Sequence, residues 1–85
     1  MAPTPTLSQV RLAVRRGIRA ATGVPVKAES SLWFDLGLGR IARNLLYWPI
    51  RETLATSTPS AALPPVDLTD ATTVGDVESI VWGAL

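Results

Sequence analysis

The segment Asp35-Leu36-Gly37-Leu38-Gly39-Arg40-Ile41 marks where this 85-residue chain changes from a loop to a helix. It follows an apolar, aromatic run at residues 31–34 and precedes residues 41–54, where apolar side chains recur at helical spacing. Two glycines interrupt the chain between these parts, which is typical of a turn. The pattern therefore predicts a loop-to-helix junction, followed by a helix over residues 40–55.

The helix expected at residues 40–55 has two distinct faces. Spacings near 3.6 residues predict a core face made of Ile41, Leu45, Leu46 or Tyr47, Ile50 and Leu54. The outward face carries Arg40, Arg43 and Arg51 against one acid, Glu52. Pro49 lacks an N–H group, so we expect a kink or a split after Trp48. At least one of Tyr47 and Trp48 should pack in the core, and the other is a candidate for a partner contact.

A first helix is predicted over residues 7–22. Thr6 and Gln9 have the spacing of a capping box, and Gly23 is the expected left-handed stop. The apolar stripe of this helix consists of Leu7, Val10, Val14, Gly17, Ile18 and Ala21, and the other face carries Arg11, Arg15, Arg16 and Arg19. Two interpretations stay open for the arginines: a docking face for an acidic partner or nucleic acid, or a solvated surface that leans on the acidic C-terminal half.

The remaining segments are a long loop, a connection and a last helix. In the loop, one of Trp33 and Phe34 should be buried and the other partly exposed, because neighbouring side chains of an extended segment point to opposite sides. Residues 56–65, rich in Ser, Thr, Ala and Pro, are interpreted as a mobile connection, and residues 66–70 as a single helical turn. Thr73 is the expected N-cap of the last helix, with acids in its first turn.

The composition excludes several classes of function. The chain has no cysteine and no histidine, so disulfides, thiolate chemistry, histidine-dependent hydrolysis and the usual zinc sites are not expected, and we predict no metal site. Residues 1–5 have neither a basic nor an apolar signal region and are expected to be disordered. No segment has the roughly 18 uninterrupted apolar residues of a membrane span. We therefore expect one domain, residues 1–85, located in the cytoplasm.

Charge is distributed unevenly along the chain. All 8 Lys and Arg residues lie within residues 1–51, together with only two of the 7 acids, although the formal net charge is just +1. Residues 52–85 hold the other acids and no base. We expect the two halves to attract each other, and each half to present a patch of one sign.

Taken together, the order of these elements resembles that of acyl carrier proteins and related peptidyl carriers. In that family an Asp-Leu-Gly turn precedes an Asp-Ser-Leu run, whose Ser opens the second helix and carries phosphopantetheine. In this chain Asp35, Leu36 and Gly37 match the turn, while Gly39, Arg40 and Ile41 stand where the family has Asp, the modified Ser and Leu. The resemblance implies an all-α, acyl-carrier-protein-like four-helix bundle, with three main helices, one short helix and a long loop between helices 1 and 2.

The same resemblance implies a function without the usual cofactor. An arginine side chain stays protonated and does not form the phosphodiester that a hydroxyl forms, so 4'-phosphopantetheine is not attachable at Arg40. The leading hypothesis is a non-catalytic binding or assembly module, not an enzyme. Its partner-binding residues would be Arg40, Arg43, Trp48 and Arg51, and its partner a protein with an acidic and apolar surface or a second copy in a homodimer.

Two alternatives belong to other classes. The chain could be a carrier of an acyl, polyketide or aminoacyl pathway whose attachment Ser is replaced. A minor alternative is a nucleic-acid-binding helical domain that uses Arg11, Arg15 and Arg19. The low net charge and the lack of aromatics among these arginines make nucleic acid an unfavoured partner.

Overall fold

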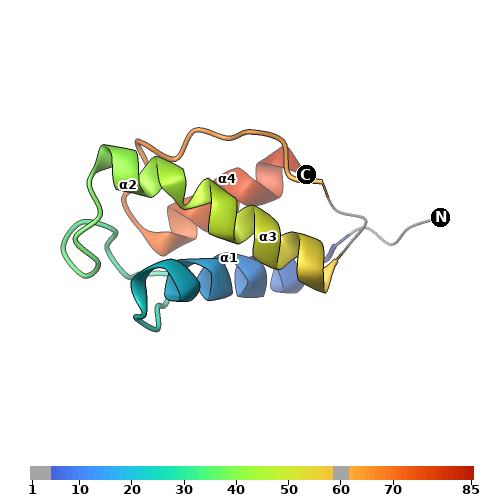
Figure 1. The fold of residues 1–85 in the computed structure, drawn as a ribbon, viewed down its shortest axis with the longest axis horizontal. Helices are drawn as coiled ribbons and strands as arrows, with labels where there is room; N and C mark the ends of the chain where they lie inside the picture. Colours follow the sequence, from blue (N-terminus) through green and yellow to red (C-terminus); the bar gives the residue numbers. More distant parts are fainter. Residues whose placement is uncertain (1–4, 59–61) are drawn as a thin grey trace.

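The computed structural model describes residues 5–58 and 62–85, and it is mostly helical (Figure 1). The helices are α1 (Leu7–Thr22), α2 (Arg40–Leu45), α3 (Tyr47–Ser57) and α4 (Val74–Ala84). Within the described residues there is no β-strand, and Ser31 and Thr73 form one isolated antiparallel bridge. The expected all-α class is confirmed. Among the same residues, no helix is long and apolar enough to cross a membrane.

Helix α1 begins and ends where its local signals predict. The Gln9 amide donates to the Thr6 hydroxyl at 3.2 Å, and the Thr6 amide donates to the Gln9 side chain at 2.8 Å, which completes the capping box. Gly23 ends the helix with a left-handed φ of 74°. The middle of the predicted apolar stripe is buried, whereas Leu7 and Ala21 are exposed because they lie in the first and last turns.

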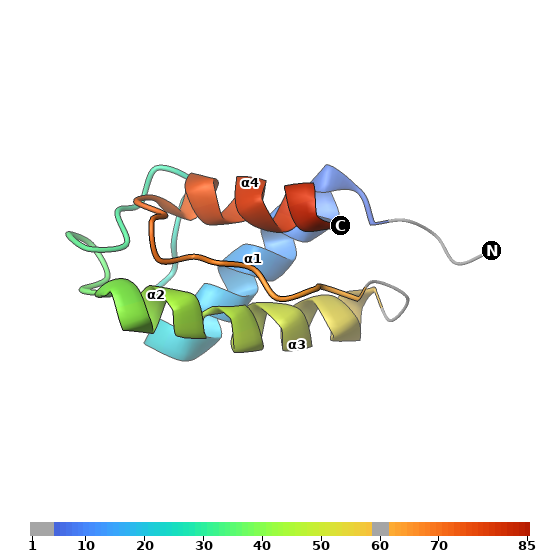
Figure 2. The same ribbon diagram turned by 90° about the horizontal axis from the view of Figure 1, so that it is seen from above.

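The core lies where α1 crosses α3 and α4. Figure 2 shows α4 on one side and α2 with α3 on the other, with α1 running diagonally behind both. From α3, Ile50 and Leu54 are fully buried against α1. A Cβ atom at Gly17 would lie 2.9 Å from both the Cα and the N of Ile50, so α1 and α3 approach each other backbone to backbone. Gly17 is therefore required by packing.

The second predicted helix is split, but upstream of the expected point. α2 ends at Leu45, whereas we expected the break after Trp48. Pro49 explains the position, because it donates no hydrogen bond to the carbonyl of Leu45 and its ring crowds that carbonyl. Pro49 itself lies in the first turn of α3, where no N–H donor is needed. At the break, the Leu46 amide bonds the Arg43 carbonyl at 3.1 Å, which tightens the last turn of α2.

Outside α1, three further side chains that we predicted to be buried lie at the surface. Ile41 and Leu45 were placed in the core face but are exposed, whereas Leu46 is buried. In the long loop, Trp33 and Phe34 are both exposed, so the expectation that one would be buried is wrong. The reason is a helix-like turn, closed by the Gly37 amide on the Trp33 carbonyl at 2.9 Å, which puts Leu32 in the core and turns the two aromatics outward.

Helix α4 confirms its predicted cap. The Thr73 hydroxyl accepts from the Asp76 amide at 3.2 Å, and the Asp76 carboxylate accepts from the amides of Thr72 and Thr73. The hydroxyl of Thr72, followed by these amides, holds the pKa of Asp76 below its usual range. Val74, Val77 and Val81 bury the apolar side of the helix.

The segment before α4 is not the helical turn predicted for residues 66–70. The Asp67 carboxylate accepts from the Thr69 amide at 3.0 Å, and this local bond replaces a helical one. Of the predicted mobile connection, residues 56 and 57 belong to α3, and residues 59–61 lie outside the described residues. Leu63 is buried. Of the expected disordered N-terminus, residues 1–4 also lie outside the described residues, while Pro5 is buried.

Candidate interaction surface

The predicted loop-to-helix junction is present, and it displays Arg40. Gly37 has a left-handed φ of 65°, which favours glycine at this position of the turn. Gly39 then occupies the N-cap of α2, and Arg40 is the first helical residue. The side chain of Arg40 is 73% exposed. Position 40 is therefore accessible from solvent at the start of a helix.

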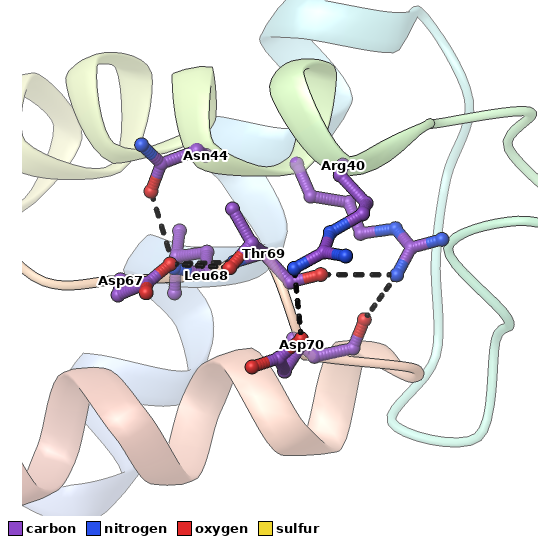
Figure 3. A network of polar contacts seen from close by, with 8 residues as sticks. Arg40, Asn44, Asp67, Leu68, Thr69 and Asp70 are labelled. Carbon is purple, nitrogen blue, oxygen red and sulfur yellow. Dashed lines mark hydrogen bonds and ion pairs between the residues drawn. The ribbon is translucent and has the colours of Figure 1, made fainter.

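The acids at residues 67–70 offset the charge of Arg40. Figure 3 shows Arg40 reaching from α2 toward Asp70, with the guanidinium 3.5 Å from the Asp70 carboxylate. Both side chains are well exposed, so the pair contributes little to stability. Nearby, the pKa of Asp67 is lowered chiefly by the Thr69 hydroxyl, with a smaller contribution from the charge of Arg40. The start of α2 is thus less basic than the sequence alone indicates.

We predicted that Arg43 would lie on the outward face of the helix, but its side chain points inward. Its Nε donates to the Leu38 carbonyl at 2.9 Å, and its Nη1 donates to the carbonyls of Thr69 and Ala71 at 3.2 and 3.1 Å. These three backbone carbonyls would otherwise need other donors. Arg43 therefore ties the long loop to the segment before α4, and it is a structural residue. Its spacing from Leu46 and Ile50, which places it on the core-facing side, is the signal that we missed.

Three apolar side chains form an exposed row along α2 and α3. Ile41, Leu45 and Trp48 are 79%, 57% and 60% exposed, and their spacing of four and three residues aligns them on one side. We call this set the outer stripe. The ring of Trp48 meets that of Tyr47 edge to face, with centroids 5.2 Å apart. Three exposed apolar side chains in one row are unusual for a solvated helix surface.

A groove lies beside the outer stripe. It has a volume of about 530 Å³ and is lined by Asn44, Leu45, Tyr47, Trp48, Arg51, Leu63, Pro65 and Val66. The Tyr47 hydroxyl donates to the Leu63 carbonyl at 2.8 Å and holds the far wall in place. The Asn44 side chain similarly accepts from the Leu68 amide at 3.2 Å (Figure 3). Of the predicted partner-binding residues, Trp48 and Arg51 are brought together at this groove. Arg40 lies at the start of α2, and Arg43 is bound to backbone carbonyls instead.

On α1, one arginine, Arg15, contacts the acidic C-terminal half of the chain. Arg15 Nε donates to Glu78 of α4 at 3.1 Å, and Glu78 is only 4% exposed. Arg15 therefore compensates a buried carboxylate, which removes it from the continuous basic row needed for a nucleic-acid interface. Arg11 and Arg19 remain exposed. At Arg15 the structure favours the second interpretation of the basic face.

Comparison with known protein families, curated proteins and solved structures finds no significant match. The resemblance to carrier proteins therefore remains a prediction from the residues quoted above. Within the described residues, no group of three or more potential metal-ligating side chains is brought together.

Proposed function

We propose that this chain is a carrier-like binding or assembly module that acts through the exposed face of α2 and α3. The observation that carries the proposal is the outer stripe: Ile41, Leu45 and Trp48 together expose apolar surface that the fold does not cover. Contiguous apolar surface of this kind marks interaction sites, and tryptophan is a favoured anchor of interfaces. The proposed role requires no catalytic residue and no cofactor.

The proposed partner is a protein with an apolar surface and acidic groups at its margin. The apolar part would cover the outer stripe and enter the groove beside Trp48. The acidic part would meet Arg51 and Arg40, which flank the stripe. Because Asp70 already lies near Arg40, we assign most of the binding energy to the apolar contact. The partner and the chain would meet in the cytoplasm.

The experiment is a capture assay with matched variants. Immobilised wild-type chain, Leu45→Arg and Leu12→Arg would be incubated with extract of the native cells. Leu12 is likewise an exposed leucine on a helix, but it lies on α1, away from the outer stripe. We expect Leu45→Arg to reduce the captured partner at least about tenfold, because a charge would be buried in the contact, and Leu12→Arg to leave it unchanged. Equal capture by all three chains would contradict the proposal.

A second candidate is a carrier scaffold whose attachment Ser is replaced by Arg40. The exposure of position 40 at the first residue of α2 favours this candidate, since an arm tethered there would reach solvent. The two candidates differ in one covalent property: under the second, the variant Gly39→Asp/Arg40→Ser would accept a phosphopantetheinyl group. The nucleic-acid alternative has no such support, since Arg15 is engaged with Glu78.

A further inference from the structure

A second cleft lies between α1 and α4, which run in opposite directions (Figure 1). It has a volume of about 590 Å³, within the roughly 300–1,000 Å³ of small-molecule sites. Each helix supplies one row of side chains at four-residue spacing, which are Leu7, Arg11 and Arg15 from α1, and Glu78 and Trp82 from α4. The α1 row extends over roughly 12 Å, which is the length of a small molecule and not of a folded partner.

The carboxylate of Glu78 is buried in the wall of this cleft, with only 5% of the side chain exposed. Arg15 Nε donates to Glu78 Oε2 at 3.1 Å, and among residues 5–58 and 62–85 this is the one hydrogen bond of either side chain. The two Nη groups of Arg15 therefore have no protein acceptor in this part of the chain, and the side chain is 39% exposed. A guanidinium that is held through Nε keeps its Nη groups as donors to the cleft.

The charges around the cleft favour an anion beside Arg11. Arg15 offsets Glu78, and the Asp76 carboxylate is occupied in the cap of α4, where the Thr72 hydroxyl donates to it at 2.6 Å. Arg11 is exposed and has no ion pair within the described part of the chain. Guanidinium groups one turn apart on a helix repel each other. A bound oxyanion would relieve this repulsion and accept hydrogen bonds from both groups.

An apolar wall adjoins the two arginines. Leu7 lies one turn before Arg11 in α1, and Trp82 lies one turn after Glu78 in α4. Because the helices run in opposite directions, Leu7 and Trp82 meet at the same end of the cleft. Both side chains are exposed, so an aromatic ring placed against them would be removed from water. The cleft thus combines an apolar end with a pair of charged donors, which suits an amphipathic small molecule.

We propose that the cleft between α1 and α4 binds a small organic anion in which an oxyanion group is joined to an aromatic body. The oxyanion accepts from Arg11 and from the Nη groups of Arg15, and the aromatic body packs against Trp82 and Leu7. A carboxylate and a phosphate supply the same oxyanion chemistry. The cleft shares no lining residue with the groove beside Trp48, so this inference does not depend on the proposed function.

The test is an NMR titration of the ¹⁵N-labelled chain with phenylacetate, phenyl phosphate and inorganic phosphate. We expect the tighter of the two aromatic probes to cause saturable shifts of the Trp82 indole N–H and the Arg15 Nε–H, with a dissociation constant on the order of 1 mM. Whichever aromatic probe binds more tightly identifies the head group as carboxylate or phosphate. Inorganic phosphate should bind at least about tenfold more weakly, because it has no apolar body to bury.

Arg11→Gln tests the anion contact, and Arg16→Gln is its matched control. Both arginines are exposed on α1, but Arg16 does not line the cleft. Arg11→Gln should weaken binding of the tighter probe about tenfold, because it removes a charged donor, whereas Arg16→Gln should bind as the wild type does. The site would be overturned if neither aromatic probe saturates, or if the shifts centre on Trp33 or Trp48. Equal binding of inorganic phosphate, or equal affinities of the two variants, would overturn it as well.

Discussion

Gly17→Ala is expected to lower the free energy of unfolding by about 2 kcal/mol, although alanine is the better helix former. The added Cβ would lie 2.9 Å from two backbone atoms of Ile50, and backbone does not move aside as a flexible side chain does. α1 and α3 would have to separate, and the buried contacts of Ile50 would loosen. Urea unfolding followed by circular dichroism measures the change.

Gly83→Ala in α4 is the matched control for this prediction. It introduces the same methyl group on a helix, but nothing lies within 4 Å of the position. We expect unchanged or increased stability, by up to about 1 kcal/mol, from the better helix propensity. If Gly17→Ala were as stable as Gly83→Ala, the close backbone approach of α1 and α3 would be contradicted.

Arg43→Leu is expected to cost about 2 kcal/mol of stability. The substitution removes the donor from three backbone carbonyls, those of Leu38, Thr69 and Ala71, and hydrogen bonds from a charged group are among the stronger ones. Water compensates only in part, because the guanidinium site is half-buried. The loop before α2 and the segment before α4 would lose their common anchor.

Arg51→Leu provides the comparison for Arg43→Leu, since Arg51 is an exposed arginine on the neighbouring helix. Surface substitutions of this kind usually change stability by less than about 0.5 kcal/mol. Thermal unfolding of the two variants should therefore separate them clearly. Equal unfolding midpoints for the two variants would show that Arg43 does not anchor the two segments and behaves as an ordinary surface arginine.

The helix ends were the most predictable features of the fold. Thr6 with Gln9 and Thr73 with Asp76 are capping pairs that lie three residues apart, so their hydrogen bonds depend on local sequence alone. The glycine at position 23 likewise predicts the left-handed residue that ends α1. The limits of α1 and the start of α4 were therefore predicted correctly without any knowledge of tertiary contacts.

The burial of α2 and α3 was less predictable, because both sides of these helices are apolar. Periodicity shows that Ile41 and Leu45 share one side and that Leu46 and Ile50 share another, but it does not show which side meets α1. The close approach at Gly17 selects the side with Ile50. Tertiary packing thus decided which apolar residues became the candidate interaction surface.

Arg43 was mispredicted for a related reason. A charged side chain on a helix is usually solvated, and the three carbonyls that hold Arg43 come from segments up to 28 residues away in the sequence. No local pattern indicates such partners. At residues 66–70, the Thr69 amide donates to the Asp67 carboxylate as in an Asx-turn, and this local bond takes the place of the helical turn that we predicted.

We propose that the chain acts without a phosphopantetheine arm, so position 40 is not an attachment site. The intact mass of the chain tests this central claim most directly. The wild-type chain and the variant Gly39→Asp/Arg40→Ser would each be incubated with a promiscuous phosphopantetheinyl transferase and coenzyme A, and the chain would also be purified from its native cells. We predict that the wild-type mass stays unchanged in both samples, while the double variant shows how far the scaffold accepts the group. A wild-type chain that carries the mass of a phosphopantetheinyl group would contradict this account.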